Sequence, residues 1–309
     1  MTFDMSKGVV DRVISSIEIK GVITALITPL TNDEEVIEEE FRKLVDFQIK
    51  HGIKGFFVTG TLGEGMKLPL ETRKRAIEIA VERARGKAPV IAHVGTSNTK
   101  TTIELAKHAA DIGADAISAI GPFFYKPDLK GLIKHYKAIG KAVDTPLFIY
   151  NNAGRQGYNI DPNIFEKIAR EVPQIVGLKD TSYNVEQLHE YVHKFGDKYI
   201  IAAAGDSMMF VAFVIGAQAH ISGISNLFPE LAVDLYNSVK RGDLEKAKQL
   251  QSKINDIKRI LKKVSEIAAY KAALKLRGIN AGIPSSPLRP LTEEEFQELK
   301  ENLQQFSLV

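Results

Sequence analysis

The feature that most constrains the fold is a regular alternation between short strand-like runs and longer stretches of helical period. Eight short apolar runs are each followed by a stretch with apolar residues three or four positions apart. This alternation is typical of βα units around a parallel sheet. The predicted strands are Val22–Thr28, Gly55–Thr59, Val90–Val94, Ala116–Ile120, Leu147–Tyr150, Ile175–Lys179, Tyr199–Ala204 and Ala219–Ile224.

The stretches between these runs predict helices. Several of them end at a glycine, as at Gly52, Gly86 and Gly113, which is a common helix stop. Eight βα units in succession predict an α/β protein whose strands close into a (β/α)8 TIM barrel. The predicted barrel helices are Glu39–His51, Leu70–Arg85, Thr99–Ile112, Leu129–Val143, Pro162–Glu171, Val185–Phe195, Met208–Gly216 and Pro229–Arg241.

The barrel is predicted to occupy residues 21–241, between an N-terminal extension (1–20) and a C-terminal helical region (242–309). Gly278–Pro290 is rich in glycine and proline and predicts a loop inside the C-terminal region. Extra helices of this kind more often cover a barrel or build an oligomer than carry catalysis. The helices predicted there are Leu244–Val264, Glu266–Arg277 and Thr292–Phe306.

Composition narrows the class of partner. Lys and Arg number 41 against 38 Asp and Glu, and the charges are interspersed, so neither nucleic acid nor a membrane surface is expected as a partner. The chain has no cysteine, and residues 1–16 lack the features of a secretion signal. We expect a soluble, cytoplasmic protein that acts on a small molecule. No metal-ligand spacing and no phosphate-binding glycine loop occurs, so no metal and no cofactor is expected.

Lys179 is the most informative single residue, because it ends the apolar run that begins at Ile175. Burial disfavours the ammonium form of lysine and leaves a nucleophilic amine, which is what a Schiff-base enzyme needs to capture a carbonyl substrate. The alternative is an ion pair with the adjacent Asp180 at the strand end.

In a TIM barrel the chemistry takes place at the carboxyl ends of the strands. Polar and aromatic residues gather at these positions after the predicted second, fourth, fifth and sixth strands. They predict one site at that rim of the barrel. The segments are Gly60-Thr61-Leu62-Gly63-Glu64, Gly121-Pro122-Phe123-Phe124-Tyr125, Tyr150-Asn151-Asn152 and Lys179-Asp180-Thr181.

Taken in this order on successive strands, the motifs make the chain resemble the dihydrodipicolinate synthase and N-acetylneuraminate lyase family of class I aldolases. The resemblance covers the chain from about Ile19 onward, and Gly177-Leu178-Lys179-Asp180 and Gly205-Asp206 belong to it, with Ile221 on the eighth strand. It implies a TIM barrel, no cofactor, and assembly as a homotetramer (a dimer of dimers).

The resemblance also implies roles at the site. Lys179 would form an imine with pyruvate or a longer 2-oxo acid, and Tyr150 would move protons. The alternative for Tyr150 is a rim tyrosine bonded to a backbone carbonyl. Gly60, Thr61 and Leu62 would bind the substrate carboxylate through backbone N–H groups and the Thr61 hydroxyl. The family often has a second hydroxyl residue where this chain has Leu62.

The resemblance and the sequence bear on several further positions. The synthases usually carry a proton-relaying tyrosine in the fourth-strand loop where this chain has Phe124, followed by Tyr125. Arg155 lies where the synthases place an arginine that grips the second substrate, and its alternative is a solvated loop arginine. Gly205 and Ile221 are candidates for substrate contact. We interpret His93 and His220 as packed core residues and Glu64 as a residue that holds its loop.

The loss of the synthase tyrosine favours an aldolase that makes or cleaves a hydroxylated 2-oxo acid, such as a 2-keto-3-deoxy sugar acid, with pyruvate as one partner. The alternative, favoured by Arg155, is 4-hydroxy-tetrahydrodipicolinate synthase, which condenses pyruvate with aspartate semialdehyde. A keto-deoxy acid dehydratase using the same lysine and a non-catalytic 2-oxo acid binding protein stay open.

Overall fold

The computed structural model describes residues 19–306. Eight strands form a closed barrel in sequence order, as the alternating pattern predicts, so the predicted TIM barrel is confirmed. All strand pairs given by residue register are parallel. The strands are β1 (Gly21–Ala25), β2 (Phe56–Val58), β3 (Val90–His93), β4 (Ala116–Ile120), β5 (Leu147–Asn151), β6 (Ile175–Asp180), β7 (Ile200–Ala204) and β8 (Ala219–Ser222).

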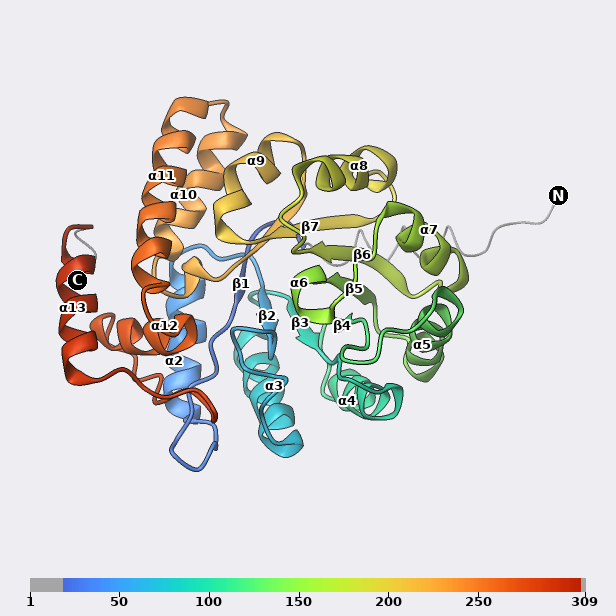
Figure 1. Ribbon diagram of the computed structural model, residues 1–309, viewed down its shortest axis with the longest axis horizontal. Coiled ribbons are helices and arrows are strands. Elements are labelled where there is room, and N and C mark those ends of the chain that lie inside the picture. Colours follow the sequence, from blue (N-terminus) through green and yellow to red (C-terminus); the bar gives the residue numbers. More distant parts are fainter. Residues whose placement is uncertain (1–18, 307–309) are drawn as a thin grey trace. The chain divides into compact units, whose positions relative to one another are not determined.

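The chain divides into two compact units. The first contains residues 89–221, in which β3 to β8 pair in order. Every residue of these six strands is buried, as expected when one sheet face fills the core and the other carries helices. Figure 1 shows these helices on the outer side of the strands. They are α4 (Thr99–Asp111), α5 (Leu129–Ala142), α7 (Pro162–Glu171), α8 (Val185–Phe195) and the shorter α9 (Met209–Val214). The short helix α6 (Ala153–Gln156) directly follows β5 and lies inside the ring of helices in that view.

The second unit contains Gly21–Ala88 and the chain from Ser222 onward. It joins the first two barrel strands to the C-terminal helices. Helices α10 and α11 lie side by side in both ribbon views. The helices of this unit are α2 (Glu38–Lys50), α3 (Leu70–Ala84), α10 (Pro229–Lys240), α11 (Leu244–Leu261), α12 (Glu266–Leu276) and α13 (Glu293–Gln304).

Local capping explains why several helices begin where the sequence predicts. The Asp161 carboxylate accepts from the backbone N–H groups of Asn163 and Ile164, and Pro162 occupies the first turn of α7. Asn184 caps α8 through the Gln187 N–H group. Both helices therefore have the predicted bounds. Strand β4 also has the bounds that the sequence predicts.

Most other elements differ from the predicted bounds by one to three residues, and the first strand ends at Ala25 and not at Thr28. Two further differences have a local cause. Helix α6 follows β5 directly and is too short to show a helical period. The eighth strand ends at Ser222 and not at Ile224, because a 3₁₀ turn over Ile224–Asn226 begins there. The predicted N-terminal extension lies outside the described residues except for Ile19 and Lys20. The predicted boundary at residue 241 stays a prediction.

Candidate active site

Lys179 and Tyr150 are direct neighbours on adjacent strands. The parallel register of β5 and β6 pairs Tyr150 with Lys179. The Lys179 Nζ atom lies 3.9 Å from the centroid of the Tyr150 ring. The residues are 4 % and 2 % exposed, respectively. The structure thus brings together the two residues for which the sequence predicts the central chemistry.

The environment of Lys179 favours its neutral amine. Burial lowers the pKa of Lys179, and the interaction with Tyr150 opposes this effect only in part. A neutral amine carries the lone pair that attacks a carbonyl carbon, whereas the ammonium form has none. The lowered pKa therefore increases the fraction of Lys179 that carries the nucleophilic lone pair.

Tyr150 is held from two sides. Its hydroxyl oxygen accepts a hydrogen bond of 2.8 Å from the Asn152 side-chain amide. The His93 ring meets the Tyr150 ring edge-on, with 5.5 Å between their centroids. His93 is buried, in keeping with its interpretation as a packed residue. These contacts fix the phenol beside the Lys179 amine.

The Asp180 carboxylate is satisfied by neutral donors. Asn151 donates to it at 2.8 Å, Ser182 at 2.6 Å and Gln187 at 3.3 Å. Successive side chains of a strand point to opposite faces, so Asp180 points away from the face that carries Lys179. The structure gives Asp180 these three partners in place of the ion pair with Lys179 that the sequence left open.

We expect Asp180→Asn to keep this network, because an amide oxygen can accept from Asn151 while its nitrogen donates to Ser182. Burial is the largest influence on the Asp180 carboxyl and raises its pKa, against the hydrogen bonds that lower it. The native state therefore holds this proton more tightly than the unfolded chain, and the stability that the proton contributes is lost as pH rises above the ordinary value of about 3.9.

An asparagine side chain does not titrate, so the variant does not lose stability as pH rises. It should be more stable than the wild type at neutral pH by roughly 1 kcal/mol. The free energy of unfolding, measured for both proteins from pH 3 to pH 8, checks this prediction. The difference between the two values should become smaller toward pH 3. A variant that is strongly destabilised at pH 7 would show that the network requires the charge.

The turn after β2 belongs to the second unit. Gly60 is buried, whereas Thr61 and Leu62 are half-buried. The turn closes on itself through hydrogen bonds from the Glu64 N–H to the Thr61 carbonyl (3.2 Å) and from the Gly65 N–H to the Gly60 carbonyl (3.1 Å). This local closure gives the turn a defined shape, as a carboxylate-binding turn requires.

The remaining predicted site residues lie in the first unit. Arg155 is exposed on α6, five residues after Tyr150. Tyr125 is 81 % exposed on the loop after β4, where its ring packs against Phe124. Gly205 follows β7 and Ile221 lies within β8.

Gly205 leaves no room for a side chain. Its φ is +89°, and a Cβ atom built there would lie 2.5 Å from the ring of Tyr183. Only glycine fits this position without a shift of the aromatic ring.

Two residues with clear structural roles were given no role from the sequence. Asn152 was placed at the rim only as part of Tyr150-Asn151-Asn152, and the structure shows that it bonds to Tyr150. Lys271 is a second buried lysine, 1 % exposed, and its signal was a lone cation in the apolar run from Ala268 to Leu274.

Among residues 19–306, no group of three or more His, Cys, Asp or Glu side chains could hold a metal ion. No helix in the same range is long and apolar enough to cross a membrane.

Comparisons with known proteins agree on one family. Residues 18–306 match the model of the dihydrodipicolinate synthetase family. The chain is 34 % identical over 293 residues to a 4-hydroxy-tetrahydrodipicolinate synthase of Methanopyrus kandleri, covering 94 % of this chain and 98 % of that protein. A protein of the same name from Acetivibrio thermocellus is 33 % identical over 290 residues, which covers 94 % and 98 % of the two chains.

Solved structures similar to this chain carry the names of two different activities. The sialic acid aldolase of Ruminococcus gnavus superposes with a TM-score of 0.90 at 31 % identity, covering 94 % of this chain and 97 % of that one. The dihydrodipicolinate synthase of Aquifex aeolicus superposes with a TM-score of 0.88 at 30 % identity, covering 94 % and 99 %.

Proposed function

The chain belongs to the dihydrodipicolinate synthetase family of pyruvate-dependent class I lyases, and we propose that Lys179 is its Schiff-base lysine with pyruvate as the first substrate. The observation that carries the proposal is the buried Lys179 amine, which has a lowered pKa and lies 3.9 Å from the Tyr150 ring centroid.

The proposed reaction begins when the Lys179 lone pair adds to the ketone carbon of pyruvate and gives a carbinolamine. The carbinolamine loses water to form an imine. Its positive nitrogen accepts the electron pair left when the adjacent methyl carbon loses a proton, which yields an enamine. The enamine carbon then adds to an aldehyde carbonyl, the new alkoxide takes up a proton, and water releases the product from Lys179. Cleavage follows the same steps in reverse.

Tyr150 is proposed as the proton carrier of these steps. Its hydroxyl group stands beside the amine and is oriented by Asn152 at 2.8 Å. Gly60, Thr61 and Leu62 are proposed to bind the pyruvate carboxylate through the β2 turn, with Thr61 supplying the side-chain hydroxyl. Gly205 and Ile221 are proposed to line the substrate.

For the aldehyde, we propose aspartate semialdehyde, so that the reaction is that of 4-hydroxy-tetrahydrodipicolinate synthase. The sequence alone favoured a 2-keto-3-deoxy sugar acid, but the most similar curated relatives given above carry the synthase name. Arg155 supports this choice, because its exposed guanidinium forms no side-chain hydrogen bond or ion pair with any residue from 19 to 306. A carboxylate on the second substrate would suit that guanidinium.

The second candidate is the aldolase for a hydroxylated 2-oxo acid that the sequence favoured. Phe124 favours it, since a phenyl ring cannot relay the proton that the synthase tyrosine carries. The similarity to a sialic acid aldolase at a TM-score of 0.90 also favours it.

The test combines adduct mapping with product analysis. We expect borohydride with pyruvate to leave a reduced adduct on the peptide that contains Lys179. With aspartate semialdehyde present, both substrates should be consumed together. Cleavage of 2-keto-3-deoxy sugar acids without product from aspartate semialdehyde would establish the second candidate. Absence of the adduct would overturn the Schiff-base assignment.

We also propose a cytoplasmic homotetramer. Phe124 and Tyr125 are 86 % and 81 % exposed and their rings meet edge to face, and two exposed aromatic rings suit a contact with a second copy of the chain. Analytical ultracentrifugation of the wild type and of Phe124→Ser checks the assembly.

A further inference from the structure

The Glu64 carboxylate joins the turn after β2 to the C-terminal region of the chain. Its side chain is fully buried. One carboxylate oxygen lies 2.7 Å from the Lys271 Nζ atom. The other accepts from the Lys67 ammonium and from the Ser285 backbone N–H, both at 2.8 Å. Two of these three partners come from beyond the barrel strands, in α12 and the segment that follows it.

Glu64 also sets the backbone of the turn. Its φ is +60°, a left-handed conformation that a residue with a side chain adopts only when its surroundings hold it there. Its N–H group bonds to the Thr61 carbonyl, and its own carbonyl accepts from the Lys67 N–H at 2.8 Å. The residue whose carboxylate Lys271 holds is therefore bonded through its own backbone to Thr61.

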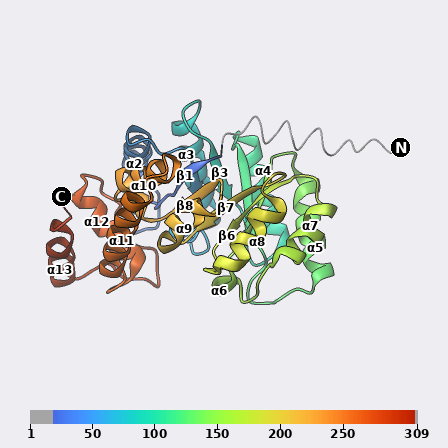
Figure 2. The same ribbon diagram turned by 90° about the horizontal axis from the view of Figure 1, so that it is seen from above.

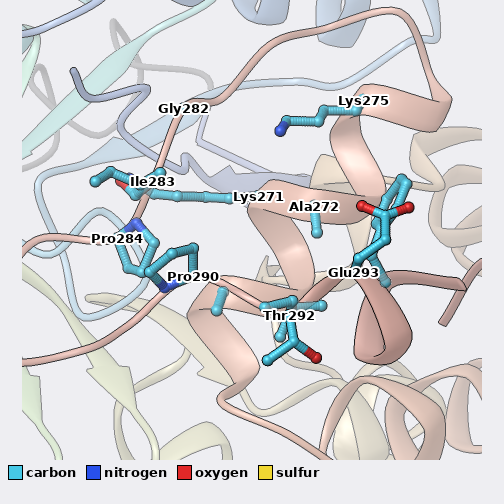
Figure 3. A pocket seen from close by; sticks show the side chains of 12 residues that line it. Lys271, Ala272, Lys275, Gly282, Ile283, Pro284, Pro290, Thr292 and Glu293 are labelled. Carbon is cyan, nitrogen blue, oxygen red and sulfur yellow. The ribbon is translucent and has the colours of Figure 1, made fainter. Parts of the chain in front are cut away.

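Lys271 is placed to hold the carboxylate firmly. Its ammonium donates to the Ile283 carbonyl at 2.6 Å in addition to the ion pair with Glu64. Burial lowers the pKa of Lys271 to about 8, although Glu64 acts to raise it. Figure 3 shows the Lys271 side chain extending from α12 toward Ile283 and Pro284, beside a cavity of about 170 Å³.

The segment that carries Ser285 is itself fixed. Leu30, which follows β1, pairs with Gly282, and the Ile283 N–H donates to the Leu30 carbonyl at 3.2 Å. A Cβ atom at Gly282 would lie 1.8 Å from that carbonyl oxygen, so the two backbones approach as closely as glycine allows. The Ser285 hydroxyl also donates to Glu34 at 2.6 Å. The donors to Glu64 thus stand on a rigid support.

From these contacts we infer that Lys271, acting through Glu64, is a positioning residue for binding of the substrate carboxylate by the turn at Gly60 and Thr61. The C-terminal helical region then contributes to substrate binding as well as to the fold. This inference rests on the proposed role of that turn in binding pyruvate.

The test compares two ketones in borohydride trapping on the full chain. Pyruvate carries a carboxylate and acetone does not, so only pyruvate depends on the turn. We expect Lys271→Met to raise the pyruvate concentration for half-maximal trapping by about tenfold or more, because it removes one partner of a buried ion pair and leaves the Glu64 charge uncompensated. Trapping by acetone should stay within twofold of the wild type. The methionine has room beside the cavity that Lys271 lines.

Lys258 offers a matched control in the same region. It is 9 % exposed in α11 and pairs with Glu266 at 3.5 Å, so Lys258→Met also removes a largely buried cation from an ion pair. This variant should leave trapping by both ketones unchanged. If Lys271→Met does not fold, the double variant Glu64→Gln/Lys271→Met removes both charges and undergoes the same comparison.

The outcomes separate the two proposals. Half-maximal pyruvate trapping within twofold of the wild type, or an equal loss with both ketones, would overturn the positioning role while leaving the Schiff-base function intact. No pyruvate adduct on the wild-type chain would overturn the proposed function, and this inference with it.

Discussion

Lys179→Met is expected to abolish the borohydride-trapped pyruvate adduct and to leave a protein that is more stable than the wild type. The adduct needs the amine, and no other nucleophile replaces it in the proposed mechanism. Stability should rise because the variant no longer buries an amine whose pKa is lowered by desolvation. We expect a gain of about 1 kcal/mol, seen as a thermal midpoint higher by roughly 2 °C.

The pH dependence gives this prediction a sign that can be checked. Because the pKa of Lys179 is lower in the folded state, the unfolded chain binds more protons between that value and the ordinary lysine value of about 10.4. Compared with the methionine variant, the wild type therefore gains free energy of unfolding as pH rises through that window. The difference in stability between the two proteins becomes smaller. A variant that still turns over substrate would remove Lys179 from the mechanism. A variant that is less stable than the wild type at pH 7 would show that the amine contributes to the fold.

Tyr150→Phe should lower kcat by about 10²- to 10³-fold, the usual effect of losing a positioned general acid or base. Folding should change little, because the ring keeps its packing against His93, although the variant loses the hydrogen bond from Asn152. The wild type and the variant are compared by steady-state turnover and by thermal unfolding.

Tyr136 provides the control for this prediction. It is a buried tyrosine of α5 whose hydroxyl donates to the Ala119 carbonyl at 3.0 Å. Tyr136→Phe should lower stability without a comparable loss of kcat. Unchanged turnover in Tyr150→Phe would move the proton transfer to Tyr125 or to water.

The sequence predicted the barrel well because each strand and helix carries its own signal. The apolar run ending at Lys179 and the proline and aspartate that open α7 can be recognised without any distant contact. The pairing of Tyr150 with Lys179 also followed, since the ends of neighbouring parallel strands meet at one edge.

Features that depend on distant partners could not be predicted in this way. The three donors to Asp180 come from different elements, and no local pattern shows which of them reaches the carboxylate. Glu64 and Lys271 are 207 positions apart in the chain, and each alone is an unremarkable charged residue. Their pairing depends on how α12 packs, which periodicity does not report.

Gly205 and Arg155 differ in how readily they tolerate substitution. This difference bears on how such an enzyme could acquire a new aldehyde substrate. Gly154 and Arg155 are exposed, so substitutions at these two positions can change charge and shape at little cost to folding. At Gly205 the Tyr183 ring occupies the space that any side chain would need. Evolution or a designer seeking a different aldehyde thus has an open route at Gly154 and Arg155, whereas the end of β7 accepts no variation without first moving an aromatic ring.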